Sequence, residues 1–145
     1  MRFRNKCLAC LAFGALLASG SAMAAVNAGQ IHMALSELKL ALVKIGVANA
    51  MLANPTPPAS NAEAHVAAPN QLASPEISAI QVSTGGVINI YFTPAVGVTG
   101  GIVQLVPRIV TDKQGKKGVE YTCYSPNIPD IATAAPECNY HAAGG

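Results

Sequence analysis

Two cysteines near the C-terminal end, Cys123 and Cys138, have the residue type and spacing that most directly indicate chemistry. Such a pair can bind a metal, exchange electrons as a redox couple, or form a structural disulfide. A zinc site needs four ligands at short spacings, and the nearest histidine, His141, has no partner. A redox pair would have the Cys-x-x-Cys spacing, whereas fourteen residues separate these cysteines. We therefore expect a disulfide, whose loop closure contributes about 3 kcal/mol.

The N-terminal residues indicate the compartment in which this disulfide would form. Three basic residues precede an apolar run from Cys7 to about Leu17, and small residues follow up to Ala24. This pattern is typical of a secretory signal peptide, so we expect residues 1–24 to be removed by cleavage between Ala24 and Ala25. A membrane anchor is the alternative, but the apolar run is about half of the roughly 20 residues that a span needs. We therefore expect an exported protein without a membrane anchor, either periplasmic or at the cell surface.

Cleavage would also change the cysteine count and the charge. It would remove Cys7 and Cys10, which leaves one pair for one disulfide in a secreted protein. It would also remove three of the 9 Lys and Arg residues, leaving six basic side chains against 7 acidic ones and a net charge near −1. Overall charge therefore gives no support to a nucleic-acid partner.

No arrangement in the chain is typical of an enzyme. The sequence has no Ser-His-Asp order in a known context and no metal-ligand spacing. The glycine pairs 85–86 and 100–101 are turn signals, because neither opens a helix that could hold a phosphate. A basic cluster is expected to be a solvated turn, with a polyanion-binding patch as the alternative: Lys113, Lys116 and Lys117. We predict no catalytic, cofactor-binding or metal-binding residues.

Residues 25–145 are long enough for one domain, which we expect to begin with a helix over residues 27–53. Apolar residues recur there at steps of four and three, as on one face of an amphipathic helix: Ile31, Leu35, Leu38, Leu42, Ile45 and Leu52. We expect this stripe to be buried on a sheet; a coiled-coil seam is the weaker alternative. Asn27 is the expected N-cap, with Gln30 as its partner in a capping box. Gly46 should weaken the helix by about 1 kcal/mol relative to alanine.

The rest of the chain predicts a connection, a sheet and a closing loop. Residues 54–75 hold five of the 10 prolines and indicate a long surface connection, of a kind that is usually functional or partly mobile. Four short apolar runs separated by turn signals follow in residues 76–124, which predicts an antiparallel sheet. The fold class is therefore α+β: an N-terminal amphipathic helix packed on a four-stranded antiparallel sheet, followed by a disulfide loop, residues 123–138.

Several motifs in this order resemble those of type IV pilins. "AGQIHMALSELKLALVKIGV" resembles the amphipathic second half of the pilin helix, and "GGVINIYF" and "GGIVQLVPRIV" resemble two strands that each follow glycines. "GVEYTC" resembles the strand with a tryptophan two residues before the first cysteine, a place that Tyr121 holds here. "TAAPEC" resembles the Pro-x-Cys closure of the pilin C-terminal loop. The resemblance covers residues 27–140 and implies a pilin-like head.

One departure from the pilin pattern limits what the resemblance implies. Type IV pilins have a short basic leader that is cut within Gly-Phe-Thr-Leu-Ile-Glu and is followed by a long apolar helix. No glutamate occurs here before Glu37, and a Sec-type signal takes the leader's place. The expectation is thus a non-catalytic, pilus-related structural or interaction protein whose partners are pilin subunits or pilus-assembly proteins, in adhesion or assembly. The alternative is a free-standing secreted module that binds a surface or DNA.

Overall fold

The structure is a computed structural model and describes residues 26–142 of the chain. The expected signal peptide, residues 1–24, and its cleavage site between Ala24 and Ala25 lie outside the described residues. The helices and strands follow one another in this order: α1 (Ala28–Leu35), α2 (Leu38–Ala53), η1 (Pro69–Leu72), β1 (Ile77–Ser83), η2 (Thr84–Gly86), β2 (Val87–Phe92), η3 (Pro94–Val96), β3 (Ile102–Thr111), β4 (Lys117–Ser125), α3 (Ile131–Ala134) and β5 (Cys138–Tyr140).

The strands form one mixed sheet in the order β1-β2-β3-β4-β5. β1 to β4 pair antiparallel, and β5 pairs with β4 in parallel. The protein is thus α+β, but the expectation of a four-stranded antiparallel sheet over residues 76–124 is incomplete. The predicted disulfide is confirmed: Cys123 and Cys138 are bonded, with their Cα atoms 4.4 Å apart. Because these two residues are also opposite each other in the β4–β5 register, the disulfide adds the fifth strand.

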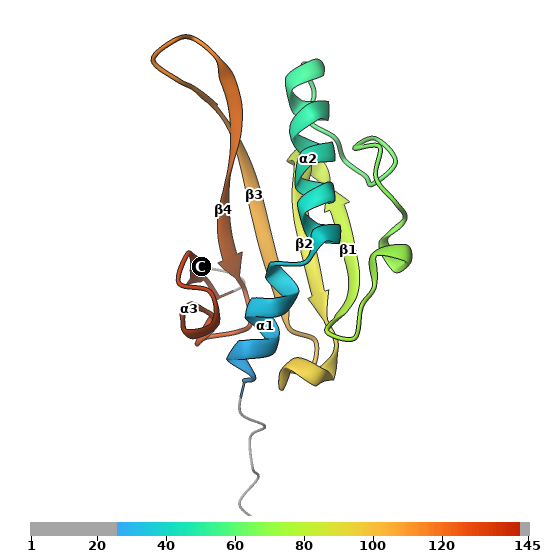
Figure 1. Cartoon of the computed structure of the whole chain (residues 1–145), viewed down its shortest axis with the longest axis vertical. Coiled ribbons are helices and arrows are strands. Elements are labelled where there is room, and N and C mark those ends of the chain that lie inside the picture. The colour runs from blue at the N-terminus through green and yellow to red at the C-terminus, as the bar shows by residue number, and fades with distance from the viewer. Residues whose placement is uncertain (1–25, 143–145) are drawn as a thin grey trace, which may run out of the picture.

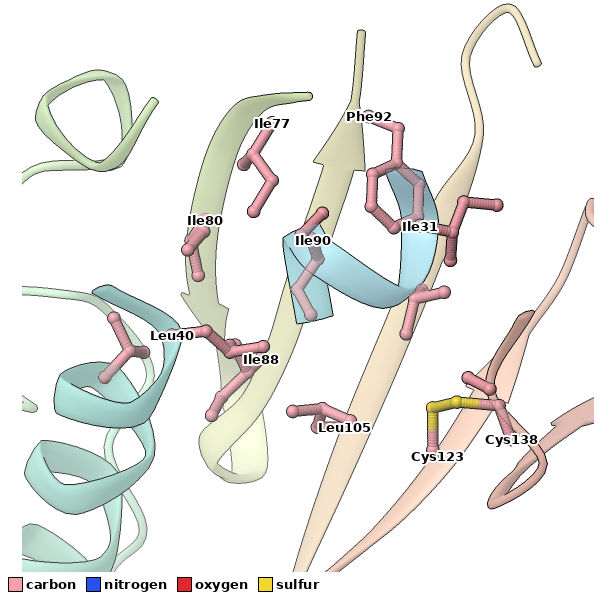
Figure 2. Packing of buried hydrophobic residues seen from close by; sticks show 14 of the residues in the cluster. Ile31, Leu40, Ile77, Ile80, Ile88, Ile90, Phe92, Leu105, Cys123 and Cys138 are labelled. Atoms are coloured by element: carbon pink, nitrogen blue, oxygen red, sulfur yellow. A yellow bond between two sulfur atoms is a disulfide. The ribbon is translucent and has the colours of Figure 1, made fainter. Parts of the chain in front are cut away.

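Both α1 and α2 lie over the same face of the sheet (Figure 1). The core lies between this helical layer and the inward side chains of the strands. Ile88, Ile90 and Phe92 of β2 are buried there, as their alternation predicts. Figure 2 shows Ile31 of α1 and Leu40 of α2 close to these strand residues, and all five belong to one buried cluster.

The helical segment is broken in two, so the expectation of one helix over residues 27–53 is wrong. α1 begins as predicted, because the side chain of Asn27 accepts a hydrogen bond from Gln30 N at 3.2 Å. The side-chain Oε1 of Gln30 has no partner among the described residues, so the reciprocal bond of a capping box is not formed through it. α1 then ends at Leu35, and its C-cap Ser36 donates its hydroxyl to the Met33 carbonyl at 2.9 Å. Glu37 is extended, with φ −62° and ψ 142°, and α2 starts after it.

The break changes which face of the second helix is buried. The residues of α2 that enter the core are a different set from the expected stripe: Leu40, Val43, Val47, Ala50 and Met51. Leu38, Leu42, Ile45 and Leu52 are instead 74%, 53%, 56% and 45% exposed. The prediction that these four pack on the sheet is wrong. The prediction failed because α2 is apolar on both faces, so periodicity alone does not decide which face is turned inward.

The connection over residues 54–75 is packed along the body instead of standing away from it. In Figure 1 it passes beside β1, at the edge of the sheet. Asn61 is buried and replaces a neighbouring strand there: its Oδ1 accepts from Val82 N at 2.7 Å and its Nδ2 donates to Ile80 O at 3.0 Å. The same Nδ2 also donates to Ala67 O at 2.8 Å, which holds the connection on itself. The edge of β1 is therefore partly closed by one side-chain amide.

Candidate interaction surface

The four large apolar residues of α2 that are exposed form a row on its outer side, here called the α2 row: Leu38, Leu42, Ile45 and Leu52. At about 100° per residue, these positions fall within an arc of about 80°. Asn49 lies in the same arc and is the row's only polar interruption. Large side chains exposed together in this way mark interaction sites more often than scattered ones do.

The lysines of α2 point away from this row and contact other parts of the same chain. Lys39 Nζ donates to the carbonyl of Ala73 in the connection. Lys44 Nζ lies 5.3 Å from the ring centroid of Tyr121, as in a cation–π contact. Lys39 and Lys44 are the only charged residues between Leu38 and Ala53, so the α2 row itself is uncharged.

A groove of about 460 Å³ runs beside the α2 row, between α2 and the connection. Leu42 and Ile45 line its helix side, and Val66 and Leu72 line its other side. Gly46 sets the width of this groove, because a Cβ there would lie 2.4 Å from Val66 Cγ1 and 2.6 Å from Ala64 O. The sequence did not predict that apolar residues of the connection line a groove. They lie in a Pro- and Ala-rich segment that has no helix or strand periodicity. His65 is exposed with a φ of 54° and lies at the groove.

The disulfide loop, residues 123–138, is also fixed to the sheet. Cys123 and Cys138 are both buried, and so are Ile128 and Ile131 within the loop. Ser125 Oγ donates to Ile102 O at 2.7 Å and accepts from Ile128 N at 3.0 Å. The loop therefore presents a defined surface.

The tyrosines near the disulfide do not form one site. Tyr121 lies on the helical side of β4, where its hydroxyl donates to Lys44 O at 2.6 Å. Burial of its ring raises the pKa of Tyr121 to about 12. Tyr124 belongs to the opposite face, where its ring meets His141 edge-on with centroids 4.8 Å apart. Tyr140 is exposed on β5.

The basic cluster is the tip of the β3–β4 hairpin. Lys113, Lys116 and Lys117 are exposed there. The Asp112 carboxylate accepts hydrogen bonds from Gln114 N and Lys116 N, which holds the chain in a turn. This geometry is that of a solvated turn between strands.

Within residues 26–142, no group of three or more His, Cys, Asp or Glu side chains could hold a metal ion. No helix in that same range has the length and apolar character to cross a membrane. The chain's most distinctive surface is thus an uncharged apolar row beside a groove. Neither a model of a known protein family nor a curated protein matches this chain.

Proposed function

We propose that the protein is a non-catalytic, exported interaction protein of the type IV pilus, which docks through the α2 row on an apolar helix of a pilin subunit or a pilus-assembly protein. One observation carries this proposal: the solvent-facing side of α2 is as apolar as its buried side. A helix that is apolar all round is normally covered on all sides. The α2 row is therefore the surface for which a partner is expected.

The shape of this surface fits a helix as the partner. The α2 row is long and narrow, and the neighbouring groove runs along it between Ile45 and Val66. A partner helix with apolar residues at i, i+3, i+4 and i+7 would bury both the row and the groove, as in other helix-in-groove complexes. Because the α2 row is uncharged, an apolar partner helix fits it better than a charged partner helix does.

The order of the elements supports the pilus as the setting. A helical segment, a long connection, antiparallel strands and a loop closed by Cys123 and Cys138 follow each other as in the pilins that the sequence resembles. Two features depart from that pattern: the break before Leu38 and the parallel strand β5. The sequence-based expectation of a Sec-type signal supports export to the compartment in which a pilus is assembled.

Photo-crosslinking in the native cell tests this proposal. A photoreactive amino acid replaces Leu42 in the α2 row, and the matched control carries it at Lys113, an exposed position at the hairpin tip. We expect the first variant, but not the second, to crosslink to a pilin or a pilus-assembly protein. Deletion of the gene should in addition alter piliation, twitching or adhesion. If all three are unchanged and neither position crosslinks to a pilus protein, the proposal is wrong.

A free-standing secreted binding module is the second candidate. The observation that favours it is a line of polar side chains on the sheet face opposite α2, which includes Gln81, Asn89 and Gln104. The two candidates separate experimentally, because the first depends on the α2 row and the second on the other face.

A further inference from the structure

Five polar or aromatic residues lie in one line across all five strands, on the sheet face opposite the helices. The strand registers pair them in sequence from β1 to β5: Gln81, Asn89, Gln104, Tyr124 and Asn139. Their neighbours Ile80, Ile88 and Val103 are buried in the core, so alternation directs the line to the open face. This line is here called the sheet row. Gln81 and Asn139, at its ends, are exposed, Gln104 and Tyr124 are partly exposed, and Asn89 is buried between its neighbours.

Hydrogen bonds hold two amides of the sheet row in place, those of Asn89 and Gln104. Gln104 Nε2 donates to Asn89 Oδ1 at 2.8 Å, and Asn89 Nδ2 donates to Ser83 Oγ at 2.9 Å. Gln104 Oε1 and the Tyr124 hydroxyl have no hydrogen-bond partner among the residues described. The Gln104 carbonyl oxygen, which accepts, and the Tyr124 phenol, which donates or accepts, are therefore available to a ligand on paired residues of β3 and β4.

A hollow lies beside Gln104 and Tyr124 of the sheet row. It has a volume of about 270 Å³ and is lined by Gln104, Tyr124, Pro126 and His141. Tyr124 and His141 meet at 72° between their ring planes, so two aromatic rings stand at an angle against one another. The hollow thus combines ring surface with amide and phenol groups, the mixture of apolar wall and few oriented polar groups that is typical of small-molecule sites.

The lack of charged side chains in the sheet row and the hollow indicates which class of ligand could bind there. Neither the sheet row nor the hollow contains Lys, Arg, Asp or Glu. Two charged residues of the same face, Arg108 and Glu120, form an ion pair with each other at 3.0 Å. Nucleic acids and other polyanions need basic side chains, which the sheet row and the hollow lack. Apolar side chains packed on this face would leave the amides without partners, which is costly.

We propose that this face binds neutral carbohydrate, with one sugar ring in the hollow against Tyr124 and further sugars along the sheet row. Sugar hydroxyls both donate and accept, which the amide and phenol groups match, and the apolar face of a pyranose packs on an aromatic ring. The strands are about 4.8 Å apart, comparable with the advance per sugar in an extended β-linked chain. The proposal does not depend on docking by the α2 row, because it uses the opposite face of the sheet.

Binding of the purified, disulfide-bonded protein to an array of neutral and anionic oligosaccharides tests the proposal. We expect binding to a neutral oligosaccharide, followed by calorimetric titration with that sugar. The variants Tyr124→Leu and His141→Ala remove the two rings of the hollow and should each lower the affinity about tenfold. His141 is exposed, so His141→Ala remains interpretable if Tyr124→Leu fails to fold.

The matched control is Tyr140→Ala, which removes an exposed aromatic ring outside the hollow and should leave the affinity unchanged. Binding to anionic sugars alone, or to no sugar on the array, would overturn the proposal. So would sugar binding that both hollow variants retain in full. Recovery of a protein ligand on this face, with no sugar bound, would show that the sheet row is a protein interface instead.

Discussion

The hydroxyl of Tyr121 in β4 donates a 2.6 Å hydrogen bond to the backbone carbonyl of Lys44 in α2, 77 residues earlier in the chain. The Lys44 ammonium group in turn lies over the Tyr121 ring. The two residues therefore fasten the middle of the helix to the β3–β4 hairpin. They do so on the buried side of α2 and leave the α2 row outside.

Removal of this hydroxyl should weaken the attachment of the helix. We expect Tyr121→Phe to lower the free energy of unfolding by about 1 kcal/mol, the typical net value of one hydrogen bond. Urea unfolding of the two proteins measures the difference. Tyr140→Phe, in which the hydroxyl comes from an exposed ring, is the control and should change nothing. Equal losses in both variants would show that the bond to Lys44 does not contribute.

Tyr121 should also make stability depend on pH in the alkaline range. Its pKa rises from 10.0 to about 12 on folding, because burial disfavours the phenolate. Between these values the unfolded chain loses the proton and the folded chain keeps it, so stability falls as the pH rises from 10 to 12. Below pH 10 this contribution is fully present. Unfolding measured at successive pH values should show a steeper alkaline loss in the wild type than in Tyr121→Phe.

Truncation of two leucines that lie two residues apart on α2 should reduce the stability by very different amounts. Leu40→Ala should cost about 2–5 kcal/mol, because Leu40 is buried in the core. Leu38→Ala should cost under about 0.5 kcal/mol, because Leu38 belongs to the exposed α2 row. Chemical denaturation of both variants makes the comparison. A larger loss for Leu38→Ala would mean that the helix faces the sheet with the other side.

Gly46 reverses an expectation drawn from helix propensity. Alanine in a helix is favoured over glycine by about 1 kcal/mol, but a methyl group at position 46 would collide with Val66 and with the carbonyl of Ala64. We expect Gly46→Ala to be destabilising by about 1–3 kcal/mol, as in other overpacked sites. Gly29→Ala in α1 is the control, since the nearest atom to its added Cβ is Asn27 Oδ1 at an ordinary 3.6 Å. A stabilised Gly46→Ala variant would show that the connection does not lie against the helix.

These residues show how far the sequence determines the fold. Ile88, Ile90 and Phe92 alternate with polar residues, so their burial follows from sequence alone. The inner face of α2 does not follow, because apolar residues surround that helix and the break at Ser36 and Glu37 shifts the phase. A break of this kind depends on local bonds to Met33 and on tertiary contact, which propensity does not contain.

The candidate sites were predictable to different degrees. The disulfide follows from the cysteine count and the compartment, whereas the sheet row requires the strand registers. Gln81, Asn89 and Gln104 are each unremarkable in sequence, and only pairing across β1, β2 and β3 brings them into line. A register is fixed by contacts between distant segments, so it is not visible along a single strand.

Asn61 should be necessary for the edge of the sheet. Asn61→Ala would leave Val82 N and the carbonyls of Ile80 and Ala67 without this partner, and we expect a loss of about 2 kcal/mol or more. Asn70→Ala, an exposed asparagine in the same connection, is the control and should be neutral. Because an unpaired edge promotes association, Asn61→Ala should also aggregate at lower concentration, measured by light scattering. Equal behaviour of the two variants would contradict this role.

The disulfide should stabilise the C-terminal end of the sheet more than the rest. Its loop has a sequence separation of 15, for which the loss of unfolded-state entropy predicts about 3 kcal/mol. The double variant Cys123→Ser, Cys138→Ser should lose about this much in denaturant unfolding. Ile128 and Ile131 stay available to hold the loop on the core, whereas β5 has three residues and depends on the bond at its first position.

Amide exchange should therefore quicken most in residues 138–141 and little in α2 when the bond is absent. Reductant should reproduce the effect in the wild type and leave the double-serine variant unchanged. His141 follows β5 directly, and its N–H donates to Ser125 O at 2.9 Å, so loss of β5 also displaces one ring of the hollow. Exchange that is equally fast along the whole chain would mean that the disulfide supports the entire fold instead. Two free thiols in the intact mass of exported protein would contradict the bond itself.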